Sequence, residues 1–488
     1  MESYVKLKKL ISDIEWDDVR GNKEVEIMGI SSHSKKVGPG YLFIAKKGAK
    51  EDGALYIEEA ISNGAVAILT DYVNPFLKEI VQLIHPHPEQ IEGLLASRFY
   101  DDPARSLFMV GITGTSGKTT TSYLVKHLFE ALKMPMGLIG TVEYLVGRLR
   151  FQAERTTPDV VTNQKLLREM VKEGCLGAVL EVTSHALAQN RVEGIAFDAA
   201  IFTNLHRDHL DYHLTMEEYA ETKSRLFSSL GREKWAIVNG DSPWIPVMLK
   251  QCTSQVLTYG LSPKNTLYAH EIELTPEGTS FSVTYGSETG RFFWKKVGRF
   301  NIYNCLAALG VCLTKGFPLQ LLIEPVSTFP QVTGRLEKVE NLKGLHIYVD
   351  YAHKPDALEN VLTFLREIKK TGRLITIFGC GGERDRGKRG QMGAIATRYS
   401  DFTWITSDNP RSEDPLAICR EIEAGVESSH YQIEPDRREA IQKAIERAQS
   451  DDLILIAGKG HETYQVFLHQ TVPFDDRKVA QEVVRQLC

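Results

Sequence analysis

Short apolar runs alternate with helix-length amphipathic segments along most of the chain. Residues 106–113, 177–182 and 197–203 are apolar runs of strand length, and helical patterns lie between them. Strands that alternate with helices are typical of a parallel sheet with helices packed on its faces. The sequence therefore predicts an α/β fold built on mostly parallel sheets.

The alternation divides the chain into three regions. The first has apolar runs at 40–45 and 65–70 on either side of a helical pattern, and it ends near Pro103, which disfavours helix at the preceding residue. The third begins near Gly334 and repeats the alternation, as in a Rossmann-type sandwich. At roughly 150 residues per domain, the 488 residues also fit about three domains. We therefore predict domains at 1–105, 106–334 and 335–488.

Two helices are predicted from their first residues. Thr215, with Glu218 three residues later, forms a capping box before an apolar pattern at 219–230. Pro355 suits the first turn of a helix over 355–369, where apolar side chains recur at helical spacing.

Composition restricts the classes of protein that fit. With 58 basic and 63 acidic residues the formal net charge is −5, which argues against a nucleic-acid partner. The 7 cysteines are scattered and never spaced as Cys-x-x-Cys, which disfavours a disulfide framework and indicates a reducing compartment. No apolar stretch has the length of a membrane span, and the first residues do not form a signal peptide. We expect a cytoplasmic monomer.

A glycine-rich turn carries the clearest chemical signal. Residues 111–120 read Gly-Ile-Thr-Gly-Thr-Ser-Gly-Lys-Thr-Thr between a predicted strand and a predicted helix. In such a loop, backbone N–H groups and the helix N-terminus bind phosphates, a lysine reaches the outer phosphates and a hydroxyl binds Mg²⁺. The loop departs from the standard pattern because Ile112 takes the place of its first glycine. We interpret it as a phosphate site rather than a simple glycine-rich connector.

Acidic and histidine side chains follow two later strands. Glu181 ends one strand, where a carboxylate can bind Mg²⁺, although a surface or helix-capping role fits it equally well. Residues 204–213 hold three histidines and two aspartates, but without a thiolate they fit a polar loop better than a structural zinc site. Lys223 lies on a predicted helix, where a lysine is usually solvated.

Two segments of the third region predict an anionic ligand. Residues 379–389 follow a strand and carry four basic side chains within six positions, Arg384, Arg386, Lys388 and Arg389. The dinucleotide fingerprint fails there because Arg384 takes the place of its last glycine, so an anionic substrate is predicted instead. Residues 408–411, Asp-Asn-Pro-Arg, follow another strand, and an arginine on such a turn can bind a carboxylate. An ordinary type I turn fits the same four residues.

These motifs together resemble those of the Mur ligase family, the cytoplasmic ATP-dependent amide ligases of peptidoglycan precursor synthesis. The resemblance spans the chain. It is carried by residues 113–120, 156–158, 181–185, 204–213, 223, 301–304, 334–335, 350–353, 379–389, 408–411 and 458–462. It implies a small N-terminal α/β domain, a central P-loop mononucleotide-binding domain and a C-terminal Rossmann-like domain. The loop of this family also lacks that first glycine, so the departure at Ile112 agrees with the resemblance.

The resemblance implies roles at the nucleotide. It assigns ATP to Gly114, Thr115, Ser116, Gly117, Lys118, Thr119, Thr120, Asn301, Asn304, Asp350 and His353. Arg335 would approach the γ-phosphate. Two Mg²⁺ ions are implied, the first bound by Thr119 and Glu181 and the second by His209 and Lys223. Lys223 would be carbamylated by CO₂, which turns an ammonium that repels metal into an anionic oxygen ligand. The implied catalytic residues are Lys118, Lys223, His209 and Arg335.

The resemblance also implies two further substrates. A muramoyl dipeptide linked to UDP would contact Ile30, Ser32, Thr156, Thr157, Thr183, Gln189 and Arg191. An incoming amino acid would contact Arg384, Asp408, Asn409, Pro410, Arg411, Gly458 and Glu462. The uridine end departs from the family pattern, because residues 31–33 read Ser-Ser-His where members usually have Asp-Ser-Arg, and an imidazole cannot replace a guanidinium fork.

The implied reaction adds the third peptide residue to UDP-N-acetylmuramoyl-L-alanyl-D-glutamate. The D-glutamyl γ-carboxylate would attack ATP to form an acyl phosphate, which an amine then attacks. Asp-Asn-Pro-Arg is the family's sequence for meso-2,6-diaminopimelate, whose distal carboxylate suits Arg411. A lysine-adding member of the family, a folylpolyglutamate synthetase, and a P-loop switch or metal chaperone are the alternatives. The sequence assigns no base for the amine.

Overall fold

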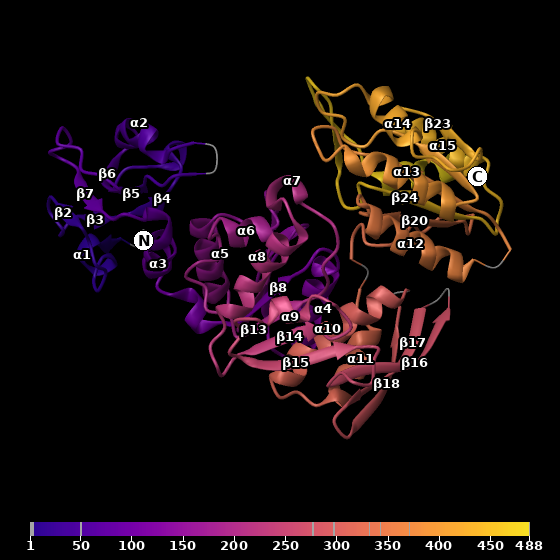
Figure 1. The fold of residues 1–488 in the computed structure, drawn as a ribbon, viewed down its shortest axis with the longest axis horizontal. Coiled ribbons are helices and arrows are strands. Elements are labelled where there is room, and N and C mark those ends of the chain that lie inside the picture. The colour runs from indigo at the N-terminus through magenta and orange to yellow at the C-terminus, as the bar shows by residue number, and fades with distance from the viewer. Residues whose placement is uncertain are drawn as a thin grey trace.

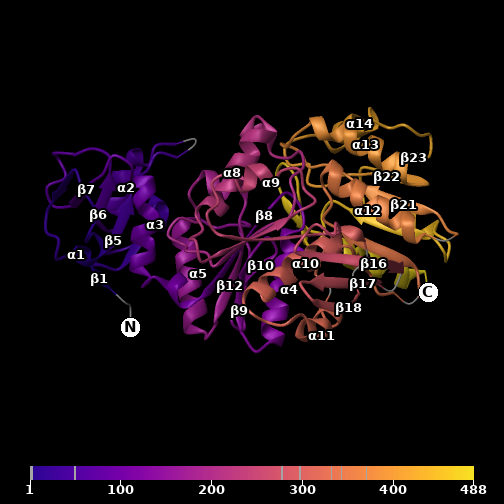
Figure 2. The same cartoon turned by 60° about the horizontal axis from the view of Figure 1, so that its bottom comes forward.

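Three α/β units follow one another along the molecule (Figure 1, Figure 2). In both views the central unit lies between the N-terminal and the C-terminal unit. Within the described ranges, no helix is both long and apolar enough to cross a membrane. The computed structural model describes residues 4–48, 51–275, 278–295, 298–330, 332–341, 343–369 and 371–487.

The N-terminal unit is a five-stranded sheet with short helices. The strands lie in the order β2 (Asp18–Arg20), β7 (Val81–Ile84), β6 (Ala65–Thr70), β5 (Tyr41–Ile44) and β4 (Gly29–Ser31). The β2–β7 pair is antiparallel and the other pairs are parallel. The predicted apolar runs form β5 and β6, and helix α2 (Ile57–Ser62) lies between them in the chain. Helix α3 (Pro88–Phe99) packs against α5 (Val160–Lys172) of the central unit (Figure 2).

The central unit is built on an eleven-stranded sheet. The three apolar runs singled out in the sequence form adjacent parallel strands at its middle, in the order β12, β8, β13. The full order is β11 (Leu149–Gln152), β10 (Glu143–Val146), β9 (Met136–Ile139), β12 (Gly177–Glu181), β8 (Phe108–Thr113), β13 (Ala199–Phe202), β14 (Trp235–Asn239), β15 (Gln255–Gly260), β16 (Leu267–Thr275), β17 (Gly278–Tyr285) and β18 (Glu288–Trp294). The β9–β10, β10–β11, β16–β17 and β17–β18 pairs are antiparallel, so the sheet is parallel at its centre and antiparallel at both edges.

Helices cover both faces of the central sheet. Alternate residues of β13 point to opposite faces: Ile201 packs with α4 (Lys118–Ala131) and α10 (Arg299–Thr314), and Phe202 packs with α5 and α8 (Met216–Ser228). Thr215 is the N-cap of α8 as predicted, because its hydroxyl accepts a hydrogen bond from the Glu218 N–H at 3.1 Å. The predicted capping box is not completed, since the Thr215 N–H donates to the carbonyl of His213 at 2.6 Å. The prediction of a mostly parallel sheet covered by helices is confirmed.

The C-terminal unit is a doubly wound, six-stranded sheet. Its order is β19 (Glu337–Lys338), β20 (His346–Asp350), β24 (Leu453–Ala457), β21 (Leu374–Phe378), β22 (Phe402–Ile405) and β23 (Tyr431–Ile433), with only the β19–β20 pair antiparallel among those described. One face carries α12 (Pro355–Ile368), α13 (Gly387–Tyr399) and α14 (Pro415–Glu423), and the other carries α15 (Arg437–Glu446) and α16 (Asp476–Gln486). This is the predicted Rossmann-like layer arrangement.

A buried ion pair joins the two helices of the second face. Arg437 on α15 and Asp476 on α16 have no exposed side-chain surface, and Nε and Nη2 of the arginine each donate to the carboxylate at 2.8 Å. Nη2 also donates to the carbonyl of Ala457 at 2.9 Å, at the last residue of β24. The pair therefore holds both helices against the end of that strand, next to residues 458–462.

We predict that Arg437→Ala lowers the unfolding free energy of the C-terminal unit by about 3–5 kcal/mol, because Asp476 is left as a buried charge without its partner. Hydrogen exchange of the β24 amides in increasing urea measures this unit alone. Arg438→Ala is the matched control, since Arg438 pairs with Glu482 at the surface, where both side chains are about half exposed. The control is expected to cost about 0–1 kcal/mol. Equal losses in the two variants would contradict the prediction.

Candidate active site

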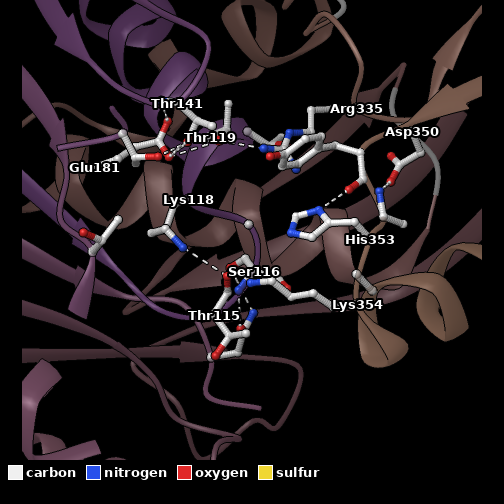
Figure 3. A pocket seen from close by; sticks show the side chains of 18 of the residues that line it. Thr115, Ser116, Lys118, Thr119, Thr141, Glu181, Arg335, Asp350, His353 and Lys354 are labelled. Carbon is white, nitrogen blue, oxygen red and sulfur yellow. Dashed lines mark hydrogen bonds between the residues drawn. The ribbon is translucent and has the colours of Figure 1, made fainter. Parts of the chain in front are cut away.

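A cavity of about 590 Å³ lies between the central and C-terminal units. Figure 3 shows its two walls, with Lys118 and Glu181 on the central side and Asp350, His353 and Lys354 facing them from the C-terminal side. The central wall is formed at the carboxyl ends of the parallel strands β8 and β12, where open α/β sheets bind ligands.

The glycine-rich loop between β8 and α4 lines this cavity. Gly114 and Gly117 have φ of +144° and +86°, and a Cβ at Gly117 would lie 2.3 Å from Oδ1 of Asn304. Both positions therefore need glycine. The ammonium of Lys118 lies over the loop and donates to the carbonyls of Gly114 at 2.8 Å and Thr115 at 3.0 Å. The loop presents backbone N–H groups, a helix N-terminus and an ammonium to one space, which is the arrangement that binds phosphates.

A fully buried carboxylate adjoins the loop. Oε2 of Glu181 accepts hydrogen bonds from the hydroxyls of Thr119 at 3.1 Å and Thr141 at 2.8 Å, and Oε1 accepts from the Thr141 N–H at 3.1 Å. Nη2 of Arg335, from the C-terminal side, donates to the Thr119 hydroxyl at 3.0 Å. Carboxylate and hydroxyl oxygens are suitable Mg²⁺ ligands, so these residues fit the metal implied by the sequence. Thr141 was not predicted, although it follows the carboxyl end of β9 as Glu181 ends β12.

Lys223 is buried, in contrast to the solvated lysine that its helical position suggested. Its ammonium donates to the carbonyl of Gly114 at 3.1 Å and lies 4.6 Å from the centroid of the Tyr219 ring. Burial lowers its pKa well below the ordinary value, and the ammonium of Lys118 lowers it further. Lys223 thus lies directly beneath the glycine-rich loop rather than on the wall of the cavity.

Two histidines of the 204–213 segment lie at or next to the cavity. His209 lines the cavity, its ring centroid lies 4.7 Å from that of His185, and burial lowers its pKa to about 3, so the ring is neutral. His213 is buried against the rings of His185 and Tyr219. In the part of the chain that the structure describes, no three or more His, Cys, Asp or Glu side chains are grouped to hold a metal ion.

Two contacts cross between the units beside the cavity. One is the Arg335–Thr119 hydrogen bond, and the other is an ion pair between Lys354 and Asp208. Burial raises the pKa of Asp208, but the ammonium of Lys354 and the neighbouring rings of His209 and His353 together hold it below its ordinary value. Burial also lowers the pKa of Lys118 to about 8, and Lys354 adds to that effect. Lys354 was not predicted as a site residue. The signal in the sequence was its position directly after the motif of residues 350–353.

A second lobe of about 500 Å³ continues from the cavity into the C-terminal unit. Its wall includes Arg411, whose Nη1 donates to the carbonyl of Gly382 at 2.7 Å. Glu462 accepts from Lys459 at 3.1 Å and from Asn409 at 2.8 Å. The two lobes share six lining residues, His185, His209, Tyr351, His353, Lys354 and Arg384.

The four basic residues of 379–389 do not act as one patch. Arg384 lines both lobes, and Lys388 lines the second lobe while donating to the carbonyl of His353 at 2.8 Å. Arg386 and Arg389 instead pair with Glu413 and Glu421. The expectation of a common anion-binding role therefore applies to Arg384 and Lys388 alone.

The structure brings most of the predicted site residues to these two lobes. The first lobe is lined by Thr115, Ser116, Gly117, Lys118, Thr119, Thr120, Thr156, Thr157, Glu181, Thr183, Arg191, His209, Asn301, Asn304, Arg335, Asp350 and His353. The second is lined by Arg384, Asp408, Asn409, Arg411, Gly458 and Glu462. Arg155 and Tyr351 line the first lobe and were not predicted.

Some predicted residues lie outside both lobes. Ile30 and Ser32 belong to the N-terminal unit, where Ile30 is buried in β4 and the neighbouring His33 is exposed. Gln189 supports the first lobe indirectly, because its side-chain oxygen accepts from Nη2 of Arg191 at 2.6 Å. Pro410 precedes Arg411 without lining the lobe.

Known proteins match the chain along its length. Residues 26–100 match the family model described as "Mur ligase family, catalytic domain", 112–312 match "Mur ligase middle domain", and 334–460 match "Mur ligase, glutamate ligase domain". The chain is 41% identical over 471 residues to the UDP-N-acetylmuramoyl-L-alanyl-D-glutamate–2,6-diaminopimelate ligase of Caldanaerobacter subterraneus subsp. tengcongensis, which covers 96% of this chain and 97% of that one.

Two solved structures have a similar fold. One is a UDP-N-acetylmuramoyl-L-alanyl-D-glutamate–2,6-diaminopimelate ligase, with a TM-score of 0.71, 32% identity and 99% coverage of both chains. The other is a MurF ligase from Thermotoga maritima in complex with ADP, with a TM-score of 0.62 and 20% identity over 94% of this chain and 96% of that chain.

We predict that Gly117→Ala weakens binding of ADP. The added Cβ would lie 2.3 Å from Asn304, and overpacking of this kind costs about 1–3 kcal/mol, or roughly tenfold to a hundredfold in Kd. Isothermal titration calorimetry measures the affinity. Gly316→Ala is the control: Gly316 has a φ of +94° but no atom within 4 Å of its added Cβ, so that variant loses roughly 1 kcal/mol of stability and keeps its affinity. Unchanged ADP affinity in Gly117→Ala would count against the phosphate site.

Proposed function

Because the chain belongs to the Mur ligase family, we propose that it is the ATP-dependent ligase that adds meso-2,6-diaminopimelate to the D-glutamyl γ-carboxylate of UDP-N-acetylmuramoyl-L-alanyl-D-glutamate. The observation that carries this proposal is the continuity of the two lobes, which share six lining residues. A phosphate site opens directly onto a lobe with arginines that suit a carboxylate. The names of the full-length relatives support the same substrate pair.

The first half-reaction would take place at the glycine-rich loop. Backbone N–H groups of residues 114–117 and the ammonium of Lys118 would bind the outer phosphates of ATP. The guanidinium of Arg335, held 3.0 Å from the Thr119 hydroxyl, would face the γ-phosphate and stabilise the charge that develops there. The D-glutamyl γ-carboxylate attacks the γ-phosphorus, ADP leaves, and an acyl phosphate forms.

Two Mg²⁺ ions complete the proposed nucleotide site. Thr119 and Glu181 would hold the first, since their oxygens already lie 3.1 Å apart, and bound Mg²⁺ would neutralise phosphate charge that repels the carboxylate. His209 and Lys223 would hold the second. Lys223 can take this role as a carbamate, and its burial favours the neutral amine that reacts with CO₂. Asn301, Asn304, Asp350 and His353 would contact the nucleoside.

The second half-reaction would take place where the lobes meet. The amine of the incoming amino acid attacks the carbonyl carbon of the acyl phosphate from the second lobe. The C–N bond forms, the C–O bond to phosphate breaks, the nitrogen loses a proton, and the amide and hydrogen phosphate are released. Arg384 lines both lobes, so it can contact an amino acid whose amine reaches the first lobe.

The UDP-linked substrate would extend from the first lobe toward the N-terminal unit. On the wall of the lobe, Nη1 of Arg191 donates to the carbonyl of Thr157 at 3.0 Å, close to the start of α5. Helix α5 in turn packs against α3 of the N-terminal unit. Ile30 and Ser32 would contact the uridine end. The domain ranges 1–105, 106–334 and 335–488, the cytoplasmic location and the monomeric state stay predictions from the sequence.

Arg411 would select the amino acid. Diaminopimelate carries a carboxylate on its distal carbon, where lysine has none, so a guanidinium gains a charge-assisted bond with the first and faces an ammonium in the second. Glu462 would hold the distal ammonium. One of its oxygens, Oε2, already accepts from Lys459 and Asn409, so Oε1 is the oxygen placed for the substrate.

The reaction is tested by phosphate release with ATP, Mg²⁺ and UDP-muramoyl dipeptide, to which diaminopimelate, lysine or glutamate is added in turn. We expect phosphate release and amide formation with diaminopimelate, and none after Mg²⁺ is chelated. Release with lysine or glutamate instead would identify a lysine-adding or a folylpolyglutamate-type ligase. ATP hydrolysis that needs neither carboxylate nor amine would indicate a P-loop switch.

We predict that Arg411→Ala lowers kcat/KM for diaminopimelate by roughly tenfold to a hundredfold, the loss expected for one hydrogen bond to a charged group. Steady-state kinetics with the amino acid as the varied substrate measure this effect. Arg420→Ala removes an exposed arginine from α14 and serves as the matched control. If kcat/KM for diaminopimelate is the same in the two variants, Arg411 does not bind the distal carboxylate.

A further inference from the structure

A buried guanidinium lies behind the loop that carries Arg384. The side chain of Arg389, on α13, is fully buried. Its Nη1 donates to Glu413 at 2.9 Å and to Glu421 at 2.8 Å, and its Nη2 donates to Glu413 at 3.0 Å. Glu421 lies on α14, which packs against α13 (Figure 1). A ligand in the second lobe does not reach a side chain so enclosed, so Arg389 acts through the groups that it holds.

Arg389 and Glu413 hold the peptide groups on both sides of Gly382. Nη2 of Arg389 donates to the carbonyl of Gly381 at 3.2 Å, and the N–H of Glu383 donates to Glu413 at 2.5 Å. The hydrogen bonds from Arg389, and next the one from Glu383, lower the pKa of Glu413 to about 2, so its carboxylate is charged at neutral pH. The ion pair and these two bonds together fix the backbone of residues 381–383.

The carbonyl of Gly382, which belongs to the same peptide group as the Glu383 N–H, orients Arg411. It accepts from Nη1 of Arg411 at 2.7 Å, and the N–H of Gly382 donates back to the carbonyl of Asn409 at 2.9 Å. A Cβ at Gly382 would lie 1.9 Å from the carbonyl oxygen of Pro410, so the two loops touch through their backbones. Arg411 itself has a φ of +54°, an unfavourable conformation for arginine that its surroundings must maintain.

We propose that the Arg389–Glu413 ion pair positions the Arg411 guanidinium and thereby sets the preference of the enzyme for an amino acid with a distal carboxylate. The inference rests on the proposed function, because it concerns the amino acid that the second lobe receives. A bidentate contact depends on both distance and orientation, and a displacement of about 1 Å can cost roughly a hundredfold in rate. Arg389 and Glu413 are therefore positioning residues: they act on the substrate through Gly382 and Arg411.

The same helix provides a matched control. Arg398, at the end of α13, forms a bidentate pair with Glu427, at 2.8 Å from Nη2 and 3.1 Å from Nε. Both side chains are about half exposed, and neither lines either lobe. Glu427→Gln and Glu413→Gln each remove one carboxylate charge from an arginine of α13. The Arg398–Glu427 pair is half exposed and does not line the second lobe, whereas the Arg389–Glu413 pair holds a buried guanidinium behind that lobe.

The test compares wild-type enzyme, Glu413→Gln, Arg389→Lys, their double variant and Glu427→Gln. KM is measured separately for diaminopimelate, ATP and the UDP-linked dipeptide, and product ratios are measured in mixtures of diaminopimelate and L-lysine. We expect Glu413→Gln to raise KM for diaminopimelate by roughly tenfold to a hundredfold and to shift the product ratio toward lysine. The other two KM values should change by less than about twofold, a split that general loss of structure would not produce.

Arg389→Lys keeps the charge but loses the bidentate geometry, so it should have the same selective effect. The double variant should have a KM for diaminopimelate close to that of either single variant, because both substitutions disrupt the same Arg389–Glu413 pair. Equal KM values for diaminopimelate in Glu413→Gln and Glu427→Gln would overturn the inference. A proportional rise of all three KM values, or additive losses in the double variant, would also overturn it. If the wild-type enzyme forms no amide with diaminopimelate, the proposed function itself is wrong.

Discussion

The buried carboxylate of Glu181 is the constraint on which the site depends. A charge removed from water is tolerated only where hydrogen-bond donors surround it. Glu181 takes donors from Thr119 and Thr141, and Thr119 accepts in turn from Arg335 of the C-terminal unit (Figure 3). One charge at the end of β12 thus connects the start of α4, the loop after β9 and the beginning of the third unit. The phosphate cavity lies where these segments meet, and its composition follows from what the carboxylate requires.

Local patterns predicted the parts of the fold that local forces determine. The N-cap Thr215 marks the start of α8, and Pro355 is the first residue of α12, because both features act within one helical turn. The buried parallel strands were predictable from their apolar runs. The antiparallel extension β16–β18 was not, because its place at the sheet edge is decided by the pairing of β16 with β15, which no local pattern records.

The candidate site divides in the same way. The glycine-rich loop was recognisable because its backbone conformation requires glycine at fixed positions, as the close contact at Gly117 shows. The state of each basic side chain was not recognisable. Lys223 and Arg389 are the same residue types as the solvated lysines and arginines of the chain, and only the neighbours supplied by distant segments decide that both are buried. Lys354 was missed for the same reason, because its partner Asp208 belongs to another unit.

The net charge of −5 is compatible with anionic ligands at every lobe once these partners are considered. A buried arginine needs a carboxylate partner, so Arg389 and Arg437 each form ion pairs with acidic side chains. Both arginines also fix the backbone around the second lobe. Arg411 faces the lobe because the backbone behind it is held by such a pair. Acidic residues are therefore part of how this chain builds a cationic site. They pair with the arginines that fix the backbone, so the N–H donors of the arginines that face the ligand stay available to it. Two sequences with identical arginines in the lobe can then differ in specificity through the acids behind it.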